Sequence, residues 1–392
     1  MRKVKHLVMK WFYRLCLVLF PVNKKVLVFE SNAGRNYTGN PRYIYEELVR
    51  QGLDRNYRIY YVFDHPGEVR LPGRVRKIRR MRFLYYYAFA VAGIWVCDLR
   101  LPNELVKRKG CTYIQTWHGT PLKKLALDMT QVHIGGEEDL GAYQEEFRKN
   151  TRTWDYLISQ NPFSTKIFRH AFDFHKKVLE IGYPRNDVLF VKNKKRAAQK
   201  IKKRLGIPED KKLMLYAPTW RDDEYYREGE YKFASPLDYR MLWEYFGGEY
   251  CMIAKYHYLV KDPIDWSEYE GFLYPCDMSY DISYLYLASD LLITDYSSVM
   301  FDYSILDRPM FFFAYDRKRY EDVLRGFYFD FPEEAPGPVV ETTEELVEAI
   351  KQYDRKKYEE RIRAFHEKFN SVEDGTAAKK VVRLICEKTG RG

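Results

Sequence analysis

From residue 25 onward, short apolar segments alternate with longer amphipathic ones, and this alternation restricts the possible folds more than any other feature of the chain. Strands that alternate with helices favour parallel sheets with helices on both faces. We expect helices at residues 41–51 and 80–91, and mostly amphipathic helix over residues 343–388. We expect strands at residues 26–29, 57–63, 92–97, 112–116, 156–159, 178–181, 212–217, 250–256, 271–274, 291–294 and 309–314.

A strongly charged segment at residues 191–211 separates two such runs, and a length of 392 residues favours two domains. The carboxyl ends of both sheets should face a central cleft, whose loops would hold the chemistry. We therefore expect an α/β protein with four parts. These are a basic amphipathic segment (1–24), an N-terminal Rossmann-like domain (25–192), a C-terminal Rossmann-like domain (193–370), and a terminal helix (371–392) able to pack back on the N-terminal domain.

The chain is basic, with 66 Lys and Arg against 55 Asp and Glu and a net charge of +11. This balance suits an anionic partner: nucleic acid, a phosphorylated substrate or an anionic membrane. The six cysteines are far apart and form no C-x-x-C pair, which indicates neither a zinc ribbon nor a disulfide framework and favours the reducing cytoplasm.

The N-terminal segment is basic and aromatic, and its longest uncharged apolar run is residues 15–22. This run is far shorter than the ~20 residues that span a bilayer. No small-residue cleavage site follows it, which argues against a signal peptide. The segment fits a helix lying on anionic lipid, and equally a helix packed on the protein's own surface.

One junction between an apolar strand and a helical pattern is rich in polar residues. Residues 291–294 form the strand, and Asp295, Ser297 and Ser298 follow before the helical pattern begins. A helix that begins just past a parallel strand presents free N–H groups to an anion, and serine hydroxyls can add donors. The alternative is an ordinary capped helix without a ligand.

A histidine follows the strand at 112–116, in the motif Gln-Thr-Trp-His-Gly-Thr-Pro-Leu-Lys-Lys at residues 115–124. Gly119 allows close approach of another group, and Pro121 can begin a helix whose first turn ends in two lysines. His118 is then well placed to exchange a proton near an anion. The alternative is a histidine that only caps the turn.

A second histidine, His257, follows the strand at 250–256, so that each half of the chain has one histidine at a strand end. We interpret the other six histidines as surface residues. Arg221, in the loop after residues 212–217, could bind a phosphate with two hydrogen bonds or pair with a neighbouring aspartate. The Gly-Tyr-Pro-Arg-Asn-Asp turn at 182–187 could be a plain connection, and helix capping alone explains residues 161–165.

Taken together, these segments resemble the CDP-glycerol glycerophosphotransferase family of wall teichoic acid synthesis, and within it the poly(glycerol phosphate) polymerase branch. The resemblance covers about residues 100–375. Its residues are Gln-Thr-Trp-His-Gly-Thr-Pro-Leu-Lys-Lys-Leu (115–125), Trp-Asp-Tyr-Leu-Ile-Ser (154–159), Ile-Gly-Tyr-Pro-Arg-Asn-Asp (181–187), Tyr-Ala-Pro-Thr-Trp-Arg-Asp-Asp (216–223), His-Tyr-Leu (257–259), Thr-Asp-Tyr-Ser-Ser-Val-Met-Phe-Asp (294–302) and Leu-Arg-Gly-Phe-Tyr (324–328).

The resemblance implies a GT-B-like fold and a peripheral enzyme on the cytoplasmic face of the cell membrane. The enzyme would move glycerol phosphate from CDP-glycerol to a hydroxyl of an undecaprenyl-diphosphate-linked teichoic acid primer, and would release CMP. The family needs no dedicated metal and no cofactor, in line with the lack of a D-x-D motif before a suitable strand. The implied partners are the donor, the primer and an anionic membrane surface, with no nucleic acid.

The resemblance also implies roles for individual residues. His118 would be the general base for the acceptor hydroxyl, and His257 would stabilise the transferring phosphoryl group or its leaving oxygen, although the two roles could be exchanged. The implied substrate-binding residues are Trp117, Gly119, Thr120, Lys123, Arg185, Pro218, Thr219, Arg221, Asp295, Ser297, Ser298, Asp302 and Arg325.

Several alternatives stay open at this point. CDP-ribitol could replace CDP-glycerol, because ribitol phosphate transferases share much of the motif set. A GT-B nucleotide-sugar glycosyltransferase would share the fold, and a basic binding protein for nucleic acid or an anionic polymer is a non-catalytic alternative. Gly119 to Pro121 argue against the primase branch, and the compact chain suggests the addition of one or a few units. The sequence leaves the number of units and the oligomeric state, including a homo-oligomer, undetermined.

Overall fold

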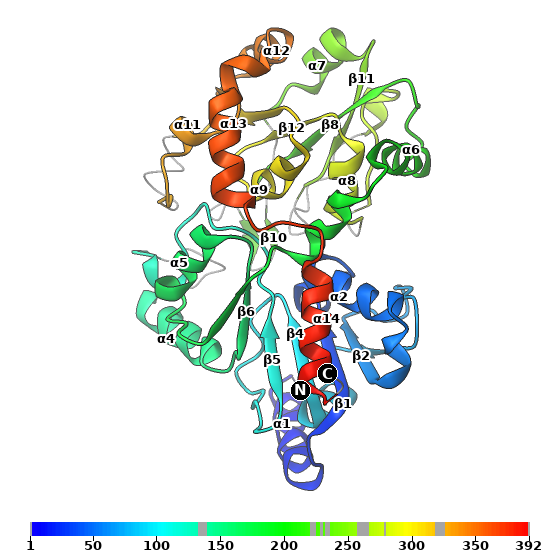
Figure 1. Ribbon diagram of the computed structural model, residues 1–392, viewed down its shortest axis with the longest axis vertical. Coiled ribbons are helices and arrows are strands. Elements are labelled where there is room, and N and C mark those ends of the chain that lie inside the picture. The colour runs from blue at the N-terminus through cyan, green and yellow to red at the C-terminus, as the bar shows by residue number, and fades with distance from the viewer. Residues whose placement is uncertain are drawn as a thin grey trace. The chain divides into compact units, whose positions relative to one another are not determined.

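The computed structural model describes residues 2–131, 139–219, 225–227, 230–231, 236–256, 266–277, 280–317 and 326–390 (Figure 1). It divides into two compact units. The first unit comprises Met1–His118, Glu145–Asp187 and Val372–Gly392, and the second comprises Gly119–Gln144 and Val188–Ser371. The last helix of the chain therefore belongs with the first unit. Residues 119–144, which we expected in the N-terminal domain, belong with the second.

The first unit is built on a parallel sheet of seven strands in the order β3-β2-β1-β4-β5-β6-β7. The order reverses between β1 and β4, as in a Rossmann fold. Both faces of the sheet are covered, because successive residues Leu27 and Val28 are both fully buried. The strands are β1 (Asn23–Glu30), β2 (Arg58–Phe63), β3 (Arg76–Arg79), β4 (Ala92–Cys97), β5 (Thr112–Gln115), β6 (Tyr156–Ser159) and β7 (Lys177–Glu180).

The helices around this sheet include the last one of the chain. Val381, Val382 and Ile385 of that helix share one hydrophobic cluster with Ile44 and Leu48. The C-terminal helix thus completes the core of the first unit. The helices are α1 (Arg2–Leu19), α2 (Gly39–Arg50), α3 (Phe83–Val91), α4 (Leu140–Thr151), which crosses the boundary between the units, α5 (Pro162–Ala171) and α14 (Ala377–Lys388).

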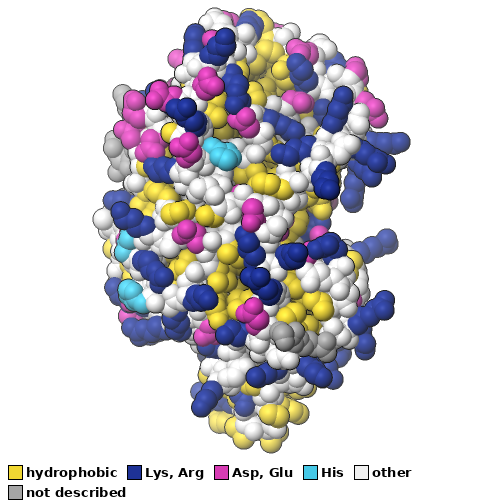
Figure 2. All heavy atoms as spheres, viewed as in Figure 1, with side chains coloured by type: hydrophobic (Ala, Val, Ile, Leu, Met, Phe, Trp, Pro, Cys, Tyr) yellow, Lys and Arg dark blue, Asp and Glu magenta, His cyan; other side chains and the backbone are white. Residues whose placement is uncertain are grey.

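Helix α1 packs on α3 through one face and exposes another apolar face. Met9, Tyr13 and Cys16 are buried at a spacing of one helix face, and the Tyr13 hydroxyl donates to the carbonyl oxygen of Val106 at 3.1 Å. On the other side, hydrophobic side chains of α1 lie open to solvent at the lower end of the view in Figure 2. Among the described helices, none has both the length and the apolar character needed to cross a bilayer.

The second unit is built on a parallel sheet of five strands in the order β11-β8-β12-β13-β14, which reverses between β8 and β12. Met214 and Leu215 are both fully buried, so this sheet is also covered on both faces. The strands are β8 (Lys212–Ala217), β11 (Tyr250–Ala254), β12 (Leu291–Thr294), β13 (Met310–Phe313) and β14 (Val339–Val340), with a separate antiparallel pair, β9 (Tyr225–Arg227) and β10 (Glu230–Tyr231).

The strand expected at residues 271–274 is wrong, because this segment forms only an isolated bridge between Met252 and Leu273. The short edge strands β3 and β14 were not predicted. The helices of the second unit are α6 (Lys194–Arg204), α7 (Tyr239–Phe246), α8 (Ile282–Ala288), α9 (Val299–Tyr303), α11 (Phe331–Glu334), α12 (Thr343–Lys351) and α13 (Arg355–Asn370).

Candidate functional site

Each sheet has one place where the strand order reverses, and parallel α/β sheets bind ligands at the carboxyl ends of the strands there. In the first unit this switch point lies between β1 and β4, and in the second between β8 and β12. The loops after these strands and after β5, which neighbours β4, carry most of the predicted site residues that the structure describes.

His118 is held by the segment that follows β4. Its Nδ1 lies 3.1 Å from the carbonyl oxygen of Asp98. Because a carbonyl can only accept a hydrogen bond, Nδ1 carries the proton of the neutral ring and Nε2 keeps its lone pair. A neutral imidazole with its lone pair on Nε2 is what a general base requires.

The pKa of His118 is lowered to about 4, chiefly because protein atoms surround the ring. The hydrogen bond to the Asp98 carbonyl opposes this shift, and the nearby charge of Arg185 adds to it. The residue nevertheless keeps a solvent-exposed surface, so water offsets part of the desolvation, and the pKa stays below the usual value of a histidine. His118 is therefore neutral at neutral pH and can accept a proton.

A buried asparagine that the sequence analysis did not single out positions the loop around His118. Asn40, at the start of α2, is 1% exposed, and its amide nitrogen donates to the carbonyl oxygens of Thr116 at 3.2 Å and Trp117 at 3.0 Å. Its amide oxygen accepts from the backbone N–H of Arg185 at 3.1 Å. Trp117 has a φ of +52°, a strained value for a bulky residue, and these bonds hold its carbonyl in place.

The other predicted residues of this motif are more enclosed. The Trp117 ring is buried, with its centroid 4.5 Å from that of Phe172, whereas Gly119 and Thr120 are buried and Lys123 is half-buried. Arg185 donates from Nη1 to the carbonyl oxygen of His118 at 2.8 Å. The packing of the Trp117 ring and the hydrogen bond from Arg185 therefore both hold the loop.

The helix expected to begin at Pro121 is wrong. The backbone of residues 122–124 instead pairs with residues 326–328 in an isolated antiparallel bridge: the N–H of Lys124 donates to the carbonyl oxygen of Gly326 at 2.9 Å, and the N–H of Tyr328 donates to that of Leu122 at 2.8 Å. These bonds use the backbone groups that a helix would need. They also explain why residues 119–144 belong with the second unit.

Two buried carboxyl groups, also not predicted, lie at the carboxyl ends of the switch-point strands of the first unit: Glu30 is the last residue of β1, and Asp98 directly follows β4. Burial raises the pKa of Asp98 to about 7; the 2.8 Å bond from the N–H of Asn32 opposes the shift, and Glu30 adds to it. Burial raises the pKa of Glu30 to about 6 against the charge of Arg80, whose Nε lies 3.2 Å from Glu30 Oε1. The Asp98 backbone that orients His118 is thus part of a buried acidic cluster.

At the second switch point, Asp295 joins the ends of β8 and β12. Its Oδ1 accepts from the backbone N–H of Thr219 at 2.8 Å, and the side chain is 1% exposed. Thr294 donates from Oγ1 to the carbonyl oxygen of Ala217 at 2.7 Å. Asp295 therefore fixes the loop that contains Pro218 and Thr219. Asp302 is buried within α9.

The serines that precede α9 are partly exposed. The Ser297 hydroxyl accepts from the N–H of Val299 at a long 3.5 Å. Ser298 occupies the N-cap position, but its side chain makes no capping bond. Its hydroxyl is thus available to a ligand.

Three predicted site residues, His257, Arg221 and Arg325, lie outside the described residues, and their roles stay predictions. Within the described ranges, no group of three or more His, Cys, Asp or Glu side chains is placed to hold a metal ion. All six cysteines are free.

The turns at residues 182–187 and 161–165, which the sequence allowed to be purely structural, each fix the start of a helix. Asp187 accepts from the N–H groups of Ala377 at 3.0 Å and Ala378 at 2.8 Å, which fixes the start of α14. Asn161 accepts from the N–H of Ser164 at 2.7 Å, which confirms the predicted cap of α5.

Comparison with known proteins identifies the family of the chain. The family described as CDP-Glycerol:Poly(glycerophosphate) glycerophosphotransferase matches residues 11–387. The teichoic acid poly(glycerol phosphate) polymerase of Bacillus subtilis (strain 168) is 46% identical over 93% of this chain, but the chain spans only 49% of that protein. The polymerase of Bacillus spizizenii (strain ATCC 23059 / NRRL B-14472 / W23) is 45% identical over 94% of this chain and 93% of its own length.

A solved structure of the wall teichoic acid polymerase TagF matches with a TM-score of 0.90 and 42% identity, over 99% of this chain and 96% of that chain. This match confirms the expected α/β, GT-B-like fold class. The chain therefore belongs to the CDP-glycerol:poly(glycerophosphate) glycerophosphotransferase family.

Proposed function

We propose that the chain transfers glycerol phosphate from CDP-glycerol to a hydroxyl group of a lipid-linked teichoic acid primer and releases CMP. The observation that carries the proposal is His118: a neutral imidazole with its proton on Nδ1, at the carboxyl edge of the first sheet. Family membership supports the choice of donor. A related structure, of a histidine-to-asparagine variant of TagF, was soaked with CDPG.

In the proposed reaction, the acceptor oxygen bonds to the phosphorus of the glycerol phosphate group. The bond from that phosphorus to the oxygen shared with CMP breaks, and CMP leaves with the electron pair. Nε2 of His118 takes the proton of the acceptor hydroxyl, and the Asp98 carbonyl stabilises the resulting imidazolium through Nδ1–H. A positioned base of this kind typically contributes ~10²–10⁴ in rate.

We assign the donor phosphates to the loops at the second switch point. Thr219, oriented by Asp295, and the hydroxyls of Ser297 and Ser298 can donate to phosphate oxygens. Phosphoryl transfer depends on positioning and on positive charge, which His257, Arg221 and Arg325 would supply.

We further propose that the protein associates peripherally with the cytoplasmic face of the membrane, where a lipid-linked primer would lie. Val8, Trp11, Leu15 and Val18 recur at helical spacing on the exposed face of α1 and are 47–82% exposed. Basic residues such as Lys10 flank this face. An exposed apolar helix face with basic neighbours fits an anionic lipid surface. The number of units added is open, because one polymerase relative has nearly the same length as this chain.

The test is CMP release from CDP-glycerol and from CDP-ribitol, with a lipid-linked primer analogue. We compare the wild type, His118→Ala and the control His366→Ala, an exposed histidine on α13. CMP release from CDP-glycerol that falls ~10²-fold or more only in His118→Ala would support the proposal. Release from CDP-ribitol alone would change the donor, and equal rates in all three proteins would refute the role of His118.

A further inference from the structure

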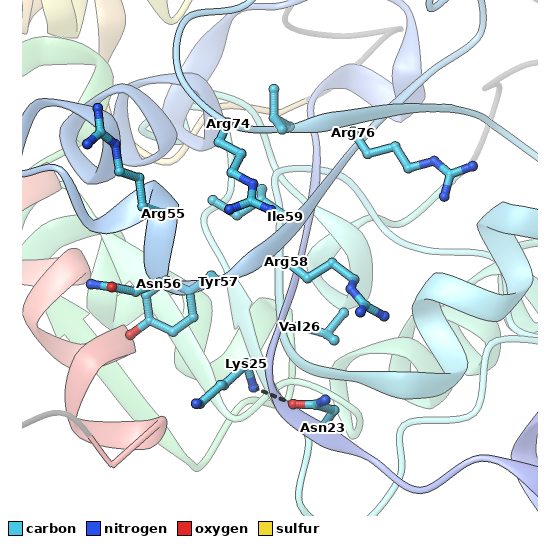
Figure 3. Close-up of a pocket in the computed structure, with 11 residues that line it drawn as sticks. Asn23, Lys25, Val26, Arg55, Asn56, Tyr57, Arg58, Ile59, Arg74 and Arg76 are labelled. Atoms are coloured by element: carbon cyan, nitrogen blue, oxygen red, sulfur yellow. Dashed lines mark hydrogen bonds between the residues drawn. The ribbon is translucent and has the colours of Figure 1, made fainter.

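A strongly basic pocket lies at the amino ends of β1, β2 and β3 (Figure 3). His118 follows the carboxyl end of β5, at the opposite edge of the same parallel sheet. Its volume is about 450 Å³, and no acidic side chain lines it in the part of the chain that the structure describes. Nothing in the proposed reaction uses this pocket. Its cationic lining residues are Lys25, Arg55, Arg58, Arg74 and Arg76, all of them exposed.

The sheet register places two of these arginines on one face. Arg58 lies two residues before Tyr60, and Tyr60 is the register partner of Arg76 on the neighbouring strand. Because side chains alternate along a strand, Arg58 and Arg76 project from the same face, and Figure 3 shows them extending to the same side. Like charges on neighbouring strands repel each other, and a bound anion would relieve this repulsion.

Among the described residues, no side chain neutralises the positive charge of the pocket. In the described part of the chain, none of the five cationic side chains makes an ion pair or a hydrogen bond. The buried carboxylate of Asp54 uses Oδ2 to accept from the backbone N–H of Arg74 at 2.7 Å. The five cations are therefore available to a ligand with negative charge.

A short segment connects the pocket to helix α1, and this connection indicates the kind of anion. Helix α1 ends at Leu19, and Asn23 already lines the pocket. Arg108 donates from Nη1 to the carbonyl oxygen of Phe20 at 2.5 Å and so fixes the connection between them. A soluble polyanion would need only the cations, whereas a lipid offers acyl chains to the apolar face and a phosphate to the pocket.

We propose that this pocket binds the phosphate group of an anionic phospholipid headgroup while the apolar face of α1 enters the interface. The proposal deepens the membrane association proposed above and is independent of the transfer reaction. It assigns the preference for anionic lipid to Arg58 and Arg76, and the general affinity for lipid to α1.

The experiment is co-sedimentation of the full chain with vesicles of phosphatidylglycerol or of phosphatidylcholine. The pocket variant is Arg58→Gln with Arg76→Gln. The matched control is Lys357→Gln with Arg363→Gln, two exposed cations of α13 that lose the same charge. Each basic residue near an anionic leaflet contributes about fivefold in partitioning, so the pocket variant should bind phosphatidylglycerol vesicles about thirtyfold more weakly. The control should change less than about twofold, and binding to phosphatidylcholine should not change.

Two further measurements distinguish a lipid phosphate from a soluble polymer phosphate, and the contribution of the pocket from that of α1. Soluble poly(glycerol phosphate) should bind the pocket variant as it binds the wild type. Equal vesicle binding by the pocket variant and its control, or loss of polymer binding alone, would overturn the proposal. A Trp11→Ser, Leu15→Ser variant should lose binding to both kinds of vesicle. If it does not, the association of α1 with the membrane is refuted, and the arginine variants remain the test of anion binding by the pocket.

Discussion

Replacement of Asn40 by alanine tests whether the loop around His118 is positioned by this one buried side chain. The change removes three hydrogen bonds, to Thr116, Trp117 and Arg185. At a net contribution of about 1 kcal/mol each, the free energy of unfolding should fall by about 3 kcal/mol. The carbonyl of Trp117, a residue with a strained positive φ, would lose its partner, so the ring of His118 should become less well oriented toward the acceptor.

A matched control separates positioning from stability. Asn150 is also buried in the first unit and makes a comparable set of bonds: it donates to Leu101 at 2.7 Å and Asn103 at 3.3 Å, and accepts from Trp154 at 3.2 Å. Asn150→Ala should therefore lose similar stability without affecting His118.

The assay is CMP release at saturating CDP-glycerol, together with urea unfolding of both variants. We expect kcat to fall about a hundredfold in Asn40→Ala with a smaller change in KM, because misplacement of a catalytic group by about 1 Å can cost this much. In Asn150→Ala, kcat should stay within about twofold. The same kcat loss in both variants, or unchanged kcat in Asn40→Ala, would refute the positioning role.

Two pH predictions follow from the shifted groups. Because the pKa of His118 lies below its usual 6.5, the rate of CMP release should hold down to pH values well under 6.5 and fall only as His118 gains a proton; a fall centred at 6.5 would contradict this. Asp98 has a raised pKa of about 7, so the folded state binds more protons than the unfolded state between about pH 4 and 7. The ionisation of Asp98 therefore lowers the free energy of unfolding as the pH rises through that window. Asp98→Asn, which keeps an oxygen for the N–H of Asn32, should weaken this pH dependence in urea unfolding at pH 5 and 8, and an unchanged difference would oppose the assignment.

The predicted strands were recognisable where strands are buried on both faces. All six residues of β4 are buried, and its predicted bounds, 92–97, match the structure. Strand β3 was not predicted because it is an edge strand in which only Ile78 is buried, and its other residues are charged, as in a surface loop. The segment at 271–274 has the composition of a strand but contributes one bridge beside the edge strand β11.

Assignment of residues 119–144 to the second unit was beyond sequence reasoning for a different reason. The motif after His118 contains Pro121 and lysines, which is a reasonable beginning for a helix. The segment is not helical because its backbone pairs with Gly326 and Tyr328, about two hundred residues away. Backbone pairing between distant segments has little sequence signature, since any non-proline residue can take part.

The same limit explains which parts of the candidate site could be predicted. His118 follows a strand in a recognisable motif, so its position at a sheet edge could be inferred from the residues alone. Its chemistry, however, depends on a carbonyl oxygen of Asp98 and on a loop held by Asn40 through two more carbonyls. Every residue has a backbone carbonyl oxygen, so hydrogen bonds to these oxygens cannot be recognised from residue types. Asn40 lies at what the sequence indicates is an ordinary helix start. The side chain that would react is thus visible in the sequence, whereas the backbone contacts that set its tautomer and orientation become visible only once β4, β5 and α2 are placed together.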